Sequence, residues 1–378
     1  MKFSSGMNRR TFVKSQATAL AAGAPTLLSE RSLDSKIRVG IIGVGGRGTA
    51  LLRRILKSPG VEVAAICDID EMARLRAAAR ASEHQPDLIY DFRELLDRKD
   101  IDAVVVATPV NLHKEMAVAT LEVHKNLYLE KPMGVNATEV QAVHQASKSS
   151  RGRLQLGFQL RFHPPRVAAI KHIHSGGIGK VLYLQGNRHT GDLPRETKWF
   201  FDKNIAGQMI VEQAVHIVDL MNWVMGTHPI QAYGAGGINL YENIPPGRTT
   251  WDHYVVIYEY PGNVQLCFTH IFFDPRGFTG IQERVWGSEY AVDLPTGTIY
   301  KLDPQNRRKL AKAEKLHTDD DDYRDATQRS VDSFFKCIRD SEEPLNNADW
   351  GRLATLTCIM GRTAVEEKRV VKWSEVAT

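Results

Sequence analysis

Three side chains with acid–base chemistry are spaced to share one face of a helix. Glu212, His216 and Asp219 stand at positions i, i+4 and i+7, which places them on the same side of a helix. A carboxylate one turn from an imidazole can orient the ring and stabilise its charged form, as a general base requires. The alternative is a structural histidine with a salt link in the helix. We take Glu212 and His216 as catalytic candidates.

A glycine-rich segment gives a second chemical signal. Residues 43–48 (GVGGRG) have the GxGxxG spacing of a dinucleotide-binding turn, and Asp68 lies twenty residues beyond Gly48. Gly43 permits a tight turn, Gly45 lets amides approach a pyrophosphate, and Gly48 lets helix and strand pack closely. Free amides at the start of the helix then face the phosphates. A purely structural glycine turn is the competing interpretation.

Asp68 also bears on the choice of cofactor. A carboxylate at this position accepts hydrogen bonds from the adenosine ribose hydroxyls and repels a 2′-phosphate. Ile69 and Asp70, which follow it, supply no cation to offset that repulsion. We therefore expect NAD rather than NADP.

Two further segments follow apolar runs, at the ends of strands where parallel sheets bind ligands. The first is residues 107–113 (ATPVNLH), in which Asn111 has the alternative role of capping the next helix. The second is Glu130-Lys131-Pro132, in which a lysine held by a stiff proline can reach a nicotinamide edge and donate to a substrate hydroxyl. For a lone Lys-Pro pair, a solvated loop cation is the competing interpretation.

A sheet and its helices must position these residues, and the first half of the chain has the required pattern. Short apolar runs alternate with helical periods, which predicts a parallel, doubly wound α/β sheet of the Rossmann type. The expected strands are 37–42, 61–66, 101–107 and 126–129, and the expected helices are 47–57, 70–83, 91–98, 112–124 and 137–149.

The second half has a different pattern, because its strands follow one another with only turns between them. Consecutive strands after an α/β half predict a separate α+β domain. We place the first domain at 36–155 and the second at 156–373. The expected strands of the second are 181–188, 253–260, 264–273 and 281–286, and its expected helices include 326–339 and 351–367.

Together these motifs resemble the glucose–fructose oxidoreductase / inositol dehydrogenase / MocA (Gfo/Idh/MocA) family. The glycine turn, Asp68, ATPxxxH and EKP occur in the family's order, followed by GFQLRF, IGKV and a helix that contains His216. The similarity extends over residues 36–373. Many family members have Asp four residues before the histidine, whereas this chain has Glu212, whose longer side chain is expected to reach the substrate instead of the imidazole.

The resemblance implies catalytic roles for Lys131 and His216. It also implies an open, mostly antiparallel second sheet with a substrate pocket and an oligomer interface, and last helices that pack back on the first domain. The expected substrate contacts are Lys131, Arg161, Glu212 and His216; His189, Trp199 and His270 are further pocket candidates with packing as the alternative. The expected cofactor contacts are Gly43, Gly45, Gly46, Arg47, Gly48, Asp68, Thr108, Pro109, Asn111, His113, Glu130, Lys131 and Gln159.

The expected reaction is hydride transfer between a sugar or polyol carbon and nicotinamide. His216 would take the hydroxyl proton while Lys131 holds the developing alkoxide. A redox-assisted glycoside hydrolase and a non-catalytic sugar-binding or nucleotide-binding sensor are the competing functions. The intact glycines, Asp68, Lys131 and His216 argue against the sensor.

Residues 1–30 are typical of a twin-arginine export signal, with a basic tail as the alternative. Residues 8–14 (NRRTFVK) precede a weakly apolar, alanine-rich stretch. Pro25 stands directly after the small residues of a cleavage-like site, so a retained anchor stays open as an alternative to cleavage. We expect a periplasmic protein that takes its cofactor with it, because twin-arginine export moves folded chains.

Charge and composition exclude several classes of protein. The net charge is +5, of which residues 1–30 supply +3, so the rest has no electrostatic case for nucleic acid. No run reaches the roughly 18 apolar residues of a membrane-spanning helix. The four cysteines form no CxxC pair and no HExxH is present, so neither a disulfide framework nor a metal site is expected. A carbohydrate substrate and a homo-oligomer formed through the second sheet are the expected partners.

Overall fold

A computed structural model describes residues 36–191, 198–301, 303, 305, 312–317 and 323–377. The expected export signal, residues 1–30, lies outside these described residues. Among them, no helix is both long enough and apolar enough to span a bilayer.

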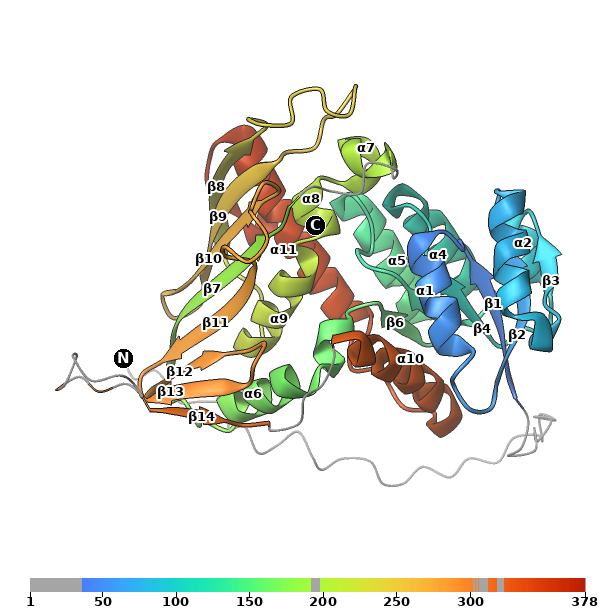
Figure 1. The fold of residues 1–378 in the computed structure, drawn as a ribbon, viewed down its shortest axis with the longest axis horizontal. Helices are drawn as coiled ribbons and strands as arrows, with labels where there is room; N and C mark the ends of the chain where they lie inside the picture. Colours follow the sequence, from blue (N-terminus) through green and yellow to red (C-terminus); the bar gives the residue numbers. More distant parts are fainter. Residues whose placement is uncertain are drawn as a thin grey trace, which may run out of the picture. The chain divides into compact units, whose positions relative to one another are not determined.

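The first domain is built on a six-stranded parallel sheet with helices between successive strands (Figure 1). The strand order β3-β2-β1-β4-β5-β6 reverses direction between β1 and β4, as in doubly wound folds. The strands are β1 Ile37–Ile42, β2 Val61–Cys67, β3 Asp87–Ile89, β4 Ala103–Val106, β5 Asn126–Leu129 and β6 Leu154–Leu156. The helices are α1 Gly46–Ile55, α2 Glu71–Arg80, α3 Phe92–Asp97, α4 His113–Glu122 and α5 Ala137–Ser149.

The parallel sheet confirms the predicted fold class, with two strands that the sequence analysis missed. β3 and β6 form the two edges of the sheet, and each has only three residues. A run this short shows no usable periodicity, whereas the central strands are continuous apolar runs because helices cover both faces.

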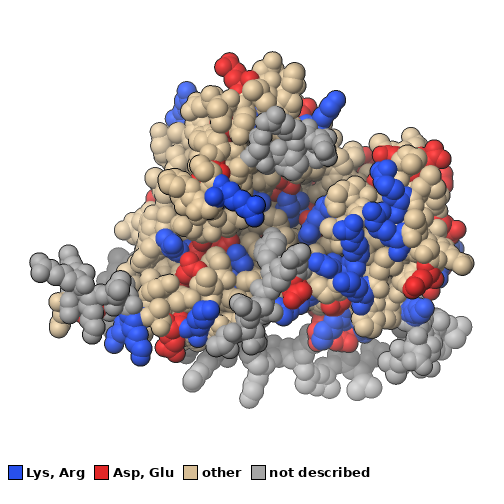
Figure 2. Space-filling model, viewed as in Figure 1, with Lys and Arg blue, Asp and Glu red and all other residues tan. Residues whose placement is uncertain are grey.

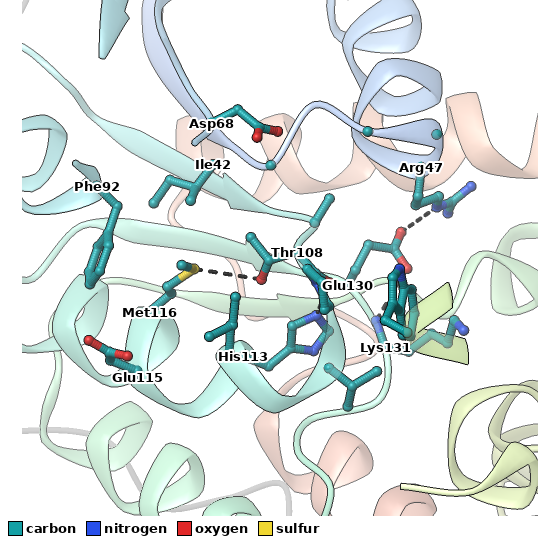
Figure 3. Close-up of a pocket in the computed structure, with 18 of the residues that line it drawn as sticks. Ile42, Arg47, Asp68, Phe92, Thr108, His113, Glu115, Met116, Glu130 and Lys131 are labelled. Carbon is teal, nitrogen blue, oxygen red and sulfur yellow. Dashed lines mark hydrogen bonds and ion pairs between the residues drawn. The ribbon is translucent and has the colours of Figure 1, made fainter. Parts of the chain in front are cut away.

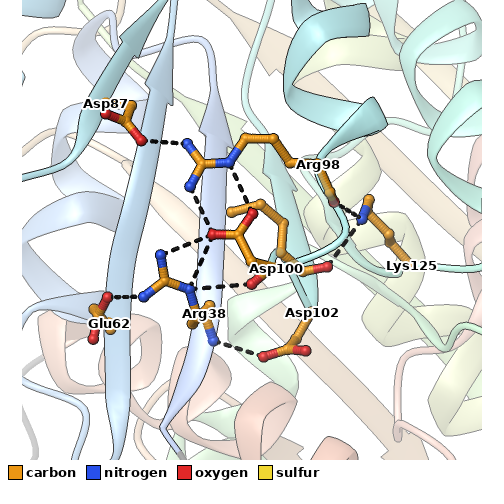
Figure 4. A network of polar contacts seen from close by, with 8 residues as sticks. Arg38, Glu62, Asp87, Arg98, Asp100, Asp102 and Lys125 are labelled. Carbon is orange, nitrogen blue, oxygen red and sulfur yellow. Dashed lines mark hydrogen bonds and ion pairs between the residues drawn. The ribbon is translucent and has the colours of Figure 1, made fainter.

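A network of charged side chains connects the strands at the amino-terminal end of this sheet, which is the end opposite the glycine turn (Figure 4). Arg38 on β1 pairs with Glu62 on β2 and with Asp100 in the loop before β4. Arg98 pairs with the same Asp100 at 2.7 Å and with Asp87 on β3 at 2.6 Å. Hydrogen bonds from Arg98 hold the pKa of Asp100 below its usual value. These contacts hold the loops at the amino-terminal end of the sheet. The glycine turn lies at the other end, where the carboxyl ends of the strands are.

The second domain contains a nine-stranded, mostly antiparallel sheet, which confirms the predicted open sheet. Its order is β14-β13-β12-β11-β7-β10-β9-β8-β15, and β7 and β10 are its parallel pair. The strands are β7 Val181–His189, β8 Gln231–Gly237, β9 His253–Tyr260, β10 Val264–Ile271, β11 Ile281–Gly287, β12 Tyr290–Asp293, β13 Thr298–Lys301, β14 Ala313–Lys315 and β15 Val371–Lys372. The helices are α6 Pro164–His174, α7 Lys203–Ala206, α8 Met209–Glu212, α9 Val215–Met225, α10 Tyr323–Asp340 and α11 Ala348–Glu367.

Two long helices near the end of the chain connect the domains. α10 packs on α1, where Val331, Phe334 and Phe335 join the core of the first domain. α11 contacts β8 and β9 of the second sheet as well as α5 and β6 of the first domain. In Figure 1, α9 and α11 lie on the inner face of the nine-stranded sheet, toward the first domain. The inner face is therefore buried. Along each strand, side chains that point to this inner face alternate with side chains that point to the outer face.

Candidate active site

A cavity of about 880 Å³ lies at the carboxyl ends of the parallel strands, next to the reversal of strand order. Open α/β sheets bind ligands there because neighbouring loops leave in opposite directions and create a crevice. The glycine turn and the ends of β4 and β5 form one wall, and β7, α8 and α9 contribute to the other. Its volume lies in the upper part of the range of ligand sites, roughly 300–1,000 Å³.

The glycines of the turn divide into two kinds by their surroundings. Gly43 has a φ of +85°, and a Cβ added to Gly48 would lie 1.9 Å from the Gly43 carbonyl oxygen. No atom lies within 4 Å of the Cβ position at Gly45 or Gly46, and both residues line the cavity. α1 begins at Gly46, so its first amides have no partner within the helix. This open, amide-lined turn fits a pyrophosphate.

Asp68 lies where β2 ends and is tied to the glycine turn. Its carboxylate accepts hydrogen bonds from the amides of Val44 at 2.8 Å and Asp70 at 3.0 Å. A carboxylate has further lone pairs, which the ribose hydroxyls of a dinucleotide would use. Ile69 beside it is uncharged, and Arg93 in the same wall already pairs with carboxylates 3.1 and 2.7 Å away. The residues present therefore fit NAD better than NADP.

The wall beyond Asp68 contains residues that the sequence analysis missed. Tyr90 and Phe92 follow the short β3, and Met116 lies on α4; all three line the cavity. Figure 3 shows Phe92 and Met116 at the end of the pocket away from Lys131. The available signal was the pair of aromatic residues directly after a strand, but β3 itself was not recognised.

The loop after β4 contributes three of its four expected contacts. Thr108, Pro109 and His113 line the cavity. Asn111 is exposed in a 3-10 turn outside the lining residues, and Leu112 rather than Asn111 occupies the N-cap of α4. Both interpretations of Asn111, as a cofactor contact and as a helix cap, therefore lack support in this geometry.

His113 joins the two loops that bear the expected nicotinamide contacts. Its Nδ1 lies 2.7 Å from the carbonyl oxygen of Pro132, and its Nε2 lies 3.0 Å from that of Thr108. Both partners are acceptors, so a neutral ring donates to only one of them at a time. Burial lowers the pKa of His113. The ring thus holds the segment beside Lys131 against the end of β4.

An ion pair crosses the cavity wall between the glycine turn and the end of β5. Arg47 Nε lies 2.6 Å from Glu130 Oε1, as Figure 3 shows. Arg47 also approaches Gln159, at 3.5 Å. All three residues line the cavity as expected, and Glu130 is almost fully buried.

Lys131 and Glu212 come together from different domains. The Lys131 ammonium donates to the Glu212 carbonyl oxygen at 2.6 Å and to Glu212 Oε1 at 2.5 Å. The second carboxylate oxygen, Oε2, is buried without a hydrogen-bond partner. An ammonium group has three donors, so this pair retains one donor and one acceptor for a ligand.

His216 is buried, lines the same cavity and has no hydrogen bond to a described residue. Burial, together with the charges of Lys131 and Arg188, lowers its pKa well below 6.5. The ring of Phe158 packs edge-on against it, with centroids 6.4 Å apart. His216 is therefore a neutral imidazole able to accept a proton from a ligand.

The prediction that Glu212, His216 and Asp219 lie on a single helix is wrong. α8 ends at Glu212 and α9 begins at Val215, so the regular helix is interrupted between Glu212 and His216. The Glu212 carboxylate binds Lys131. Asp219 points into the core, not the cavity.

Arg161 belongs to the core and does not line the cavity, which corrects its expected contact with substrate. Its guanidinium makes two hydrogen bonds of 2.8 Å to Asp219, and both side chains are fully buried. The rings of Trp223 and Trp350 lie 5.0 and 4.2 Å from its central carbon. Sequence spacing cannot show that an arginine and an aspartate 58 residues apart neutralise each other.

Of the other pocket candidates, only Trp199 lines the cavity. His189 bonds to Thr279 and Thr269 at 2.7 and 2.9 Å. His270 is fully buried, with Nδ1 2.7 Å from the Tyr254 hydroxyl oxygen. For these two histidines, the packing alternative describes the structure.

Arg188, Phe200 and Gln213 line the cavity beside His216 and were missed as site residues. The sequence analysis placed Arg188 only at the end of an expected strand. A charged residue at a strand end was the signal that could have marked it as a site residue. Cys67 also lines the wall, and burial raises the pKa of its thiol to about 12. No cluster of three or more potential metal ligands occurs among the described residues.

Comparison with known proteins agrees with this geometry. Residues 37–158 match "Oxidoreductase family, NAD-binding Rossmann fold", and residues 167–292 match "GFO/IDH/MocA C-terminal domain". The chain belongs to the Gfo/Idh/MocA family. It is an NAD-dependent oxidoreductase whose first domain binds the cofactor.

Relatives of this Gfo/Idh/MocA protein align over most of its length. It is 26% identical to the inositol 2-dehydrogenase of Salmonella paratyphi B over 329 residues, which cover 85% of this chain and 92% of that protein. A glycosyl hydrolase family 109 protein from Saccharopolyspora erythraea is 34% identical over 158 residues, 40% of this chain and 34% of that protein. A levoglucosan dehydrogenase solved with NADH and levoglucosan has a TM-score of 0.78 at 20% identity, over 89% of this chain and 99% of that one. This last likeness supports the fold alone.

Proposed function

We propose that this Gfo/Idh/MocA protein oxidises a hydroxyl-bearing carbon of a sugar or polyol, and that the residues brought together in the cavity perform the reaction. Bound NAD supplies the hydride acceptor. The observation that carries the proposal is the meeting of the glycine turn with Lys131, Glu212 and His216 in one cavity. The named activity of the inositol 2-dehydrogenase supports the same substrate class.

The protein's own groups suit the proton chemistry of this reaction. His216, neutral and without a hydrogen bond, accepts the proton of the substrate hydroxyl. Lys131 uses its remaining donor to stabilise the oxygen as it becomes negative. Glu212 holds the ammonium in place through two contacts, and its free oxygen accepts from a neighbouring substrate hydroxyl.

Substitution of Lys131 and His216 tests this assignment. Lys131→Ala and His216→Ala should each lower kcat by roughly 10²- to 10⁴-fold, because each removes a positioned acid–base group. The measurement is NADH formation at 340 nm with a panel of sugars and inositols. His144→Ala is a matched control, since His144 lies outside the cavity, where its Nε2 is 2.7 Å from Asp349 Oδ1. Near-normal turnover in both cavity variants would rule out the assignment.

A redox-assisted glycoside hydrolase is the second candidate. The similarity to a glycosyl hydrolase family 109 protein, at 34% identity over 158 residues, favours it. In such a reaction the hydride is returned after a bond is eliminated, so the cofactor shows no net change. Release of free sugar from an aryl glycoside without a lasting signal at 340 nm would select the hydrolase over the dehydrogenase.

We also propose that the protein is exported by the twin-arginine route and functions in the periplasm. The support is the NRRTFVK segment at residues 8–14 and its alanine-rich continuation. Nicotinamide dinucleotides are made in the cytoplasm, so an exported enzyme has to take its cofactor along and keep it.

A homo-oligomer formed through the nine-stranded sheet is our third proposal for this protein. The outer face of that sheet exposes apolar side chains, and Figure 1 shows no described helix over it. Tyr183, Tyr233, Val255 and Ile257 are 37, 49, 37 and 47% exposed on strands β7, β8 and β9. Exposed apolar side chains on a sheet face without a covering helix are typical of a protein–protein interface.

A further inference from the structure

Among the residues that the structure describes, one cation in the cavity wall has no carboxylate partner. Arg188, near the end of β7, donates from Nε to Gln213 Oε1 at 3.2 Å. No described carboxylate forms an ion pair with its guanidinium. Figure 2 shows both basic and acidic side chains around the hollow between the two domains. A partly buried guanidinium held by an amide alone keeps its other donors for a ligand.

The other charges at this end of the cavity are balanced. Lys131 pairs with Glu212, and Arg47 pairs with Glu130 at 2.6 Å. His216 is neutral, and the charge of Arg188 is among the causes that lower its pKa. Counted over the described residues, the wall near the proposed reaction centre therefore has one positive charge in excess, which an anionic ligand would neutralise.

An aromatic surface lies in the same wall. The rings of Trp199 and Phe200 stack with centroids 4.1 Å apart and an interplanar angle of 17°. Both residues line the cavity, and both are partly exposed. Flat aromatic faces suit the C–H face of a sugar ring, so this wall combines a carbohydrate platform with a carboxylate-binding fork.

We propose that the substrate is an acidic monosaccharide, such as a uronic acid, whose carboxylate binds Arg188 while its reacting hydroxyl faces Lys131 and His216. This inference rests on the proposed dehydrogenase function and specifies its substrate class. In the reaction a carbinol would become a carbonyl: bound NAD⁺ would supply the hydride acceptor, and His216 would take the hydroxyl proton. The carboxylate is unchanged and only positions the ring.

Matched pairs of sugars test the inference. We would measure kcat/KM for glucuronate against glucose, galacturonate against galactose, and mannuronate against mannose. At least one acid should exceed its neutral parent by about 10- to 100-fold, the range for hydrogen bonds to a charged group. Arg188→Gln should remove that preference, and Arg188→Lys, which keeps the charge without the fork, should retain part of it.

Calorimetric titration of the same acids into the holoenzyme gives a readout independent of turnover. Binding of the preferred acid should weaken in Arg188→Gln by a similar factor, with an unchanged melting temperature. Arg276→Gln is the matched control, because Arg276 is exposed in the loop between β10 and β11, outside the cavity lining. It removes one positive charge and should leave the preference intact.

Three results would overturn the inference. They are activity without preference for any acid, equal losses on acids and neutral sugars in Arg188→Gln, and a stronger preference for sugar 6-phosphates than for uronates. Absence of activity on every sugar would instead overturn the proposed dehydrogenase function, so the two failures are distinguishable.

Discussion

The chemistry proposed for His216 depends on its surroundings more than on its residue type. A free imidazole has a pKa near 6.5 and is partly protonated in mildly acidic solution. In this site, burial and the nearby charges of Lys131 and Arg188 shift that pKa well below 6.5. The ring consequently stays neutral, which is the form that accepts a proton.

The pH dependence of kcat/KM should reveal this shift. The active form of His216 is neutral and its pKa is lowered, so activity should persist as the pH falls through 6.5 and decline only at lower pH. Initial rates between about pH 5 and pH 8 would locate the acid limb. An acid limb centred at or above 6.5 would contradict the burial argument.

At the scale of elements, the glycine turn and α1 show how one motif separates folding from binding. Gly48 is in contact with the backbone of Gly43, whereas Gly46 faces open space in the cavity. A methyl group added at Gly48 would overlap protein atoms, whereas one added at Gly46 would contact only a bound ligand. The two substitutions should therefore affect different properties.

Gly48→Ala should lower the melting temperature by several degrees, because its Cβ would overlap the Gly43 carbonyl oxygen and push α1 from β1. Gly46→Ala should leave the melting temperature of the ligand-free protein unchanged, since an alanine fits the first helical turn. It should weaken NAD binding by about tenfold or more by crowding the pyrophosphate. Thermal melts and titrations with NAD would measure both, and similar effects of the two variants would refute this division.

The element scale also explains the arrangement of Lys131 and Glu212. Lys131 follows β5, and Glu212 closes the short α8. The Glu212 carboxylate accepts a hydrogen bond from Lys131, and His113 holds the loop on the other side through the Pro132 carbonyl. Three separate elements thus determine the position of one ammonium group.

At the scale of the whole molecule, export predicts that the cofactor stays bound. Protein purified from the periplasm without added nucleotide should release close to one equivalent of NAD on denaturation. Mass spectrometry of the released small molecules would identify and quantify the dinucleotide. Protein that is empty and binds NAD only at millimolar concentrations would contradict retention, although it would leave the dehydrogenase chemistry untouched.

The outer face of the nine-stranded sheet predicts an oligomer that one charge can disrupt. Ile257→Lys should shift the protein to a smaller species in light scattering coupled to gel filtration, because it buries an unpaired ammonium group in the proposed interface. Leu75→Lys is the matched control, since Leu75 is 45% exposed on α2 and Ile257 is 47% exposed on β9. A monomeric parent protein, or an equal response to both changes, would reject this interface.

The sequence alone was sufficient for the class of fold and for the cofactor. Three local patterns carried these predictions: the continuous apolar strands, the GxGxxG turn and Asp68. Each of them acts through residues that are near in the chain or on the next strand. Several residues that were expected at the site consequently line the cavity: Gly43, Gly45, Gly46, Asp68, Lys131 and His216. In the parallel sheet, the three-residue edge strands β3 and β6 were too short to detect. In the second domain, β8 and the short strands β12 to β15 were not expected either.

Tertiary structure decided which charged side chains face the ligand. Helical spacing grouped Glu212, His216 and Asp219, but in the structure Glu212 pairs with Lys131, and Asp219 binds Arg161 in the core. Arg188 entered the cavity from the other domain, where no motif marks it. Charges choose partners by distance in space and by the loss of water around them, and neither quantity is contained in the spacing of residues along the chain.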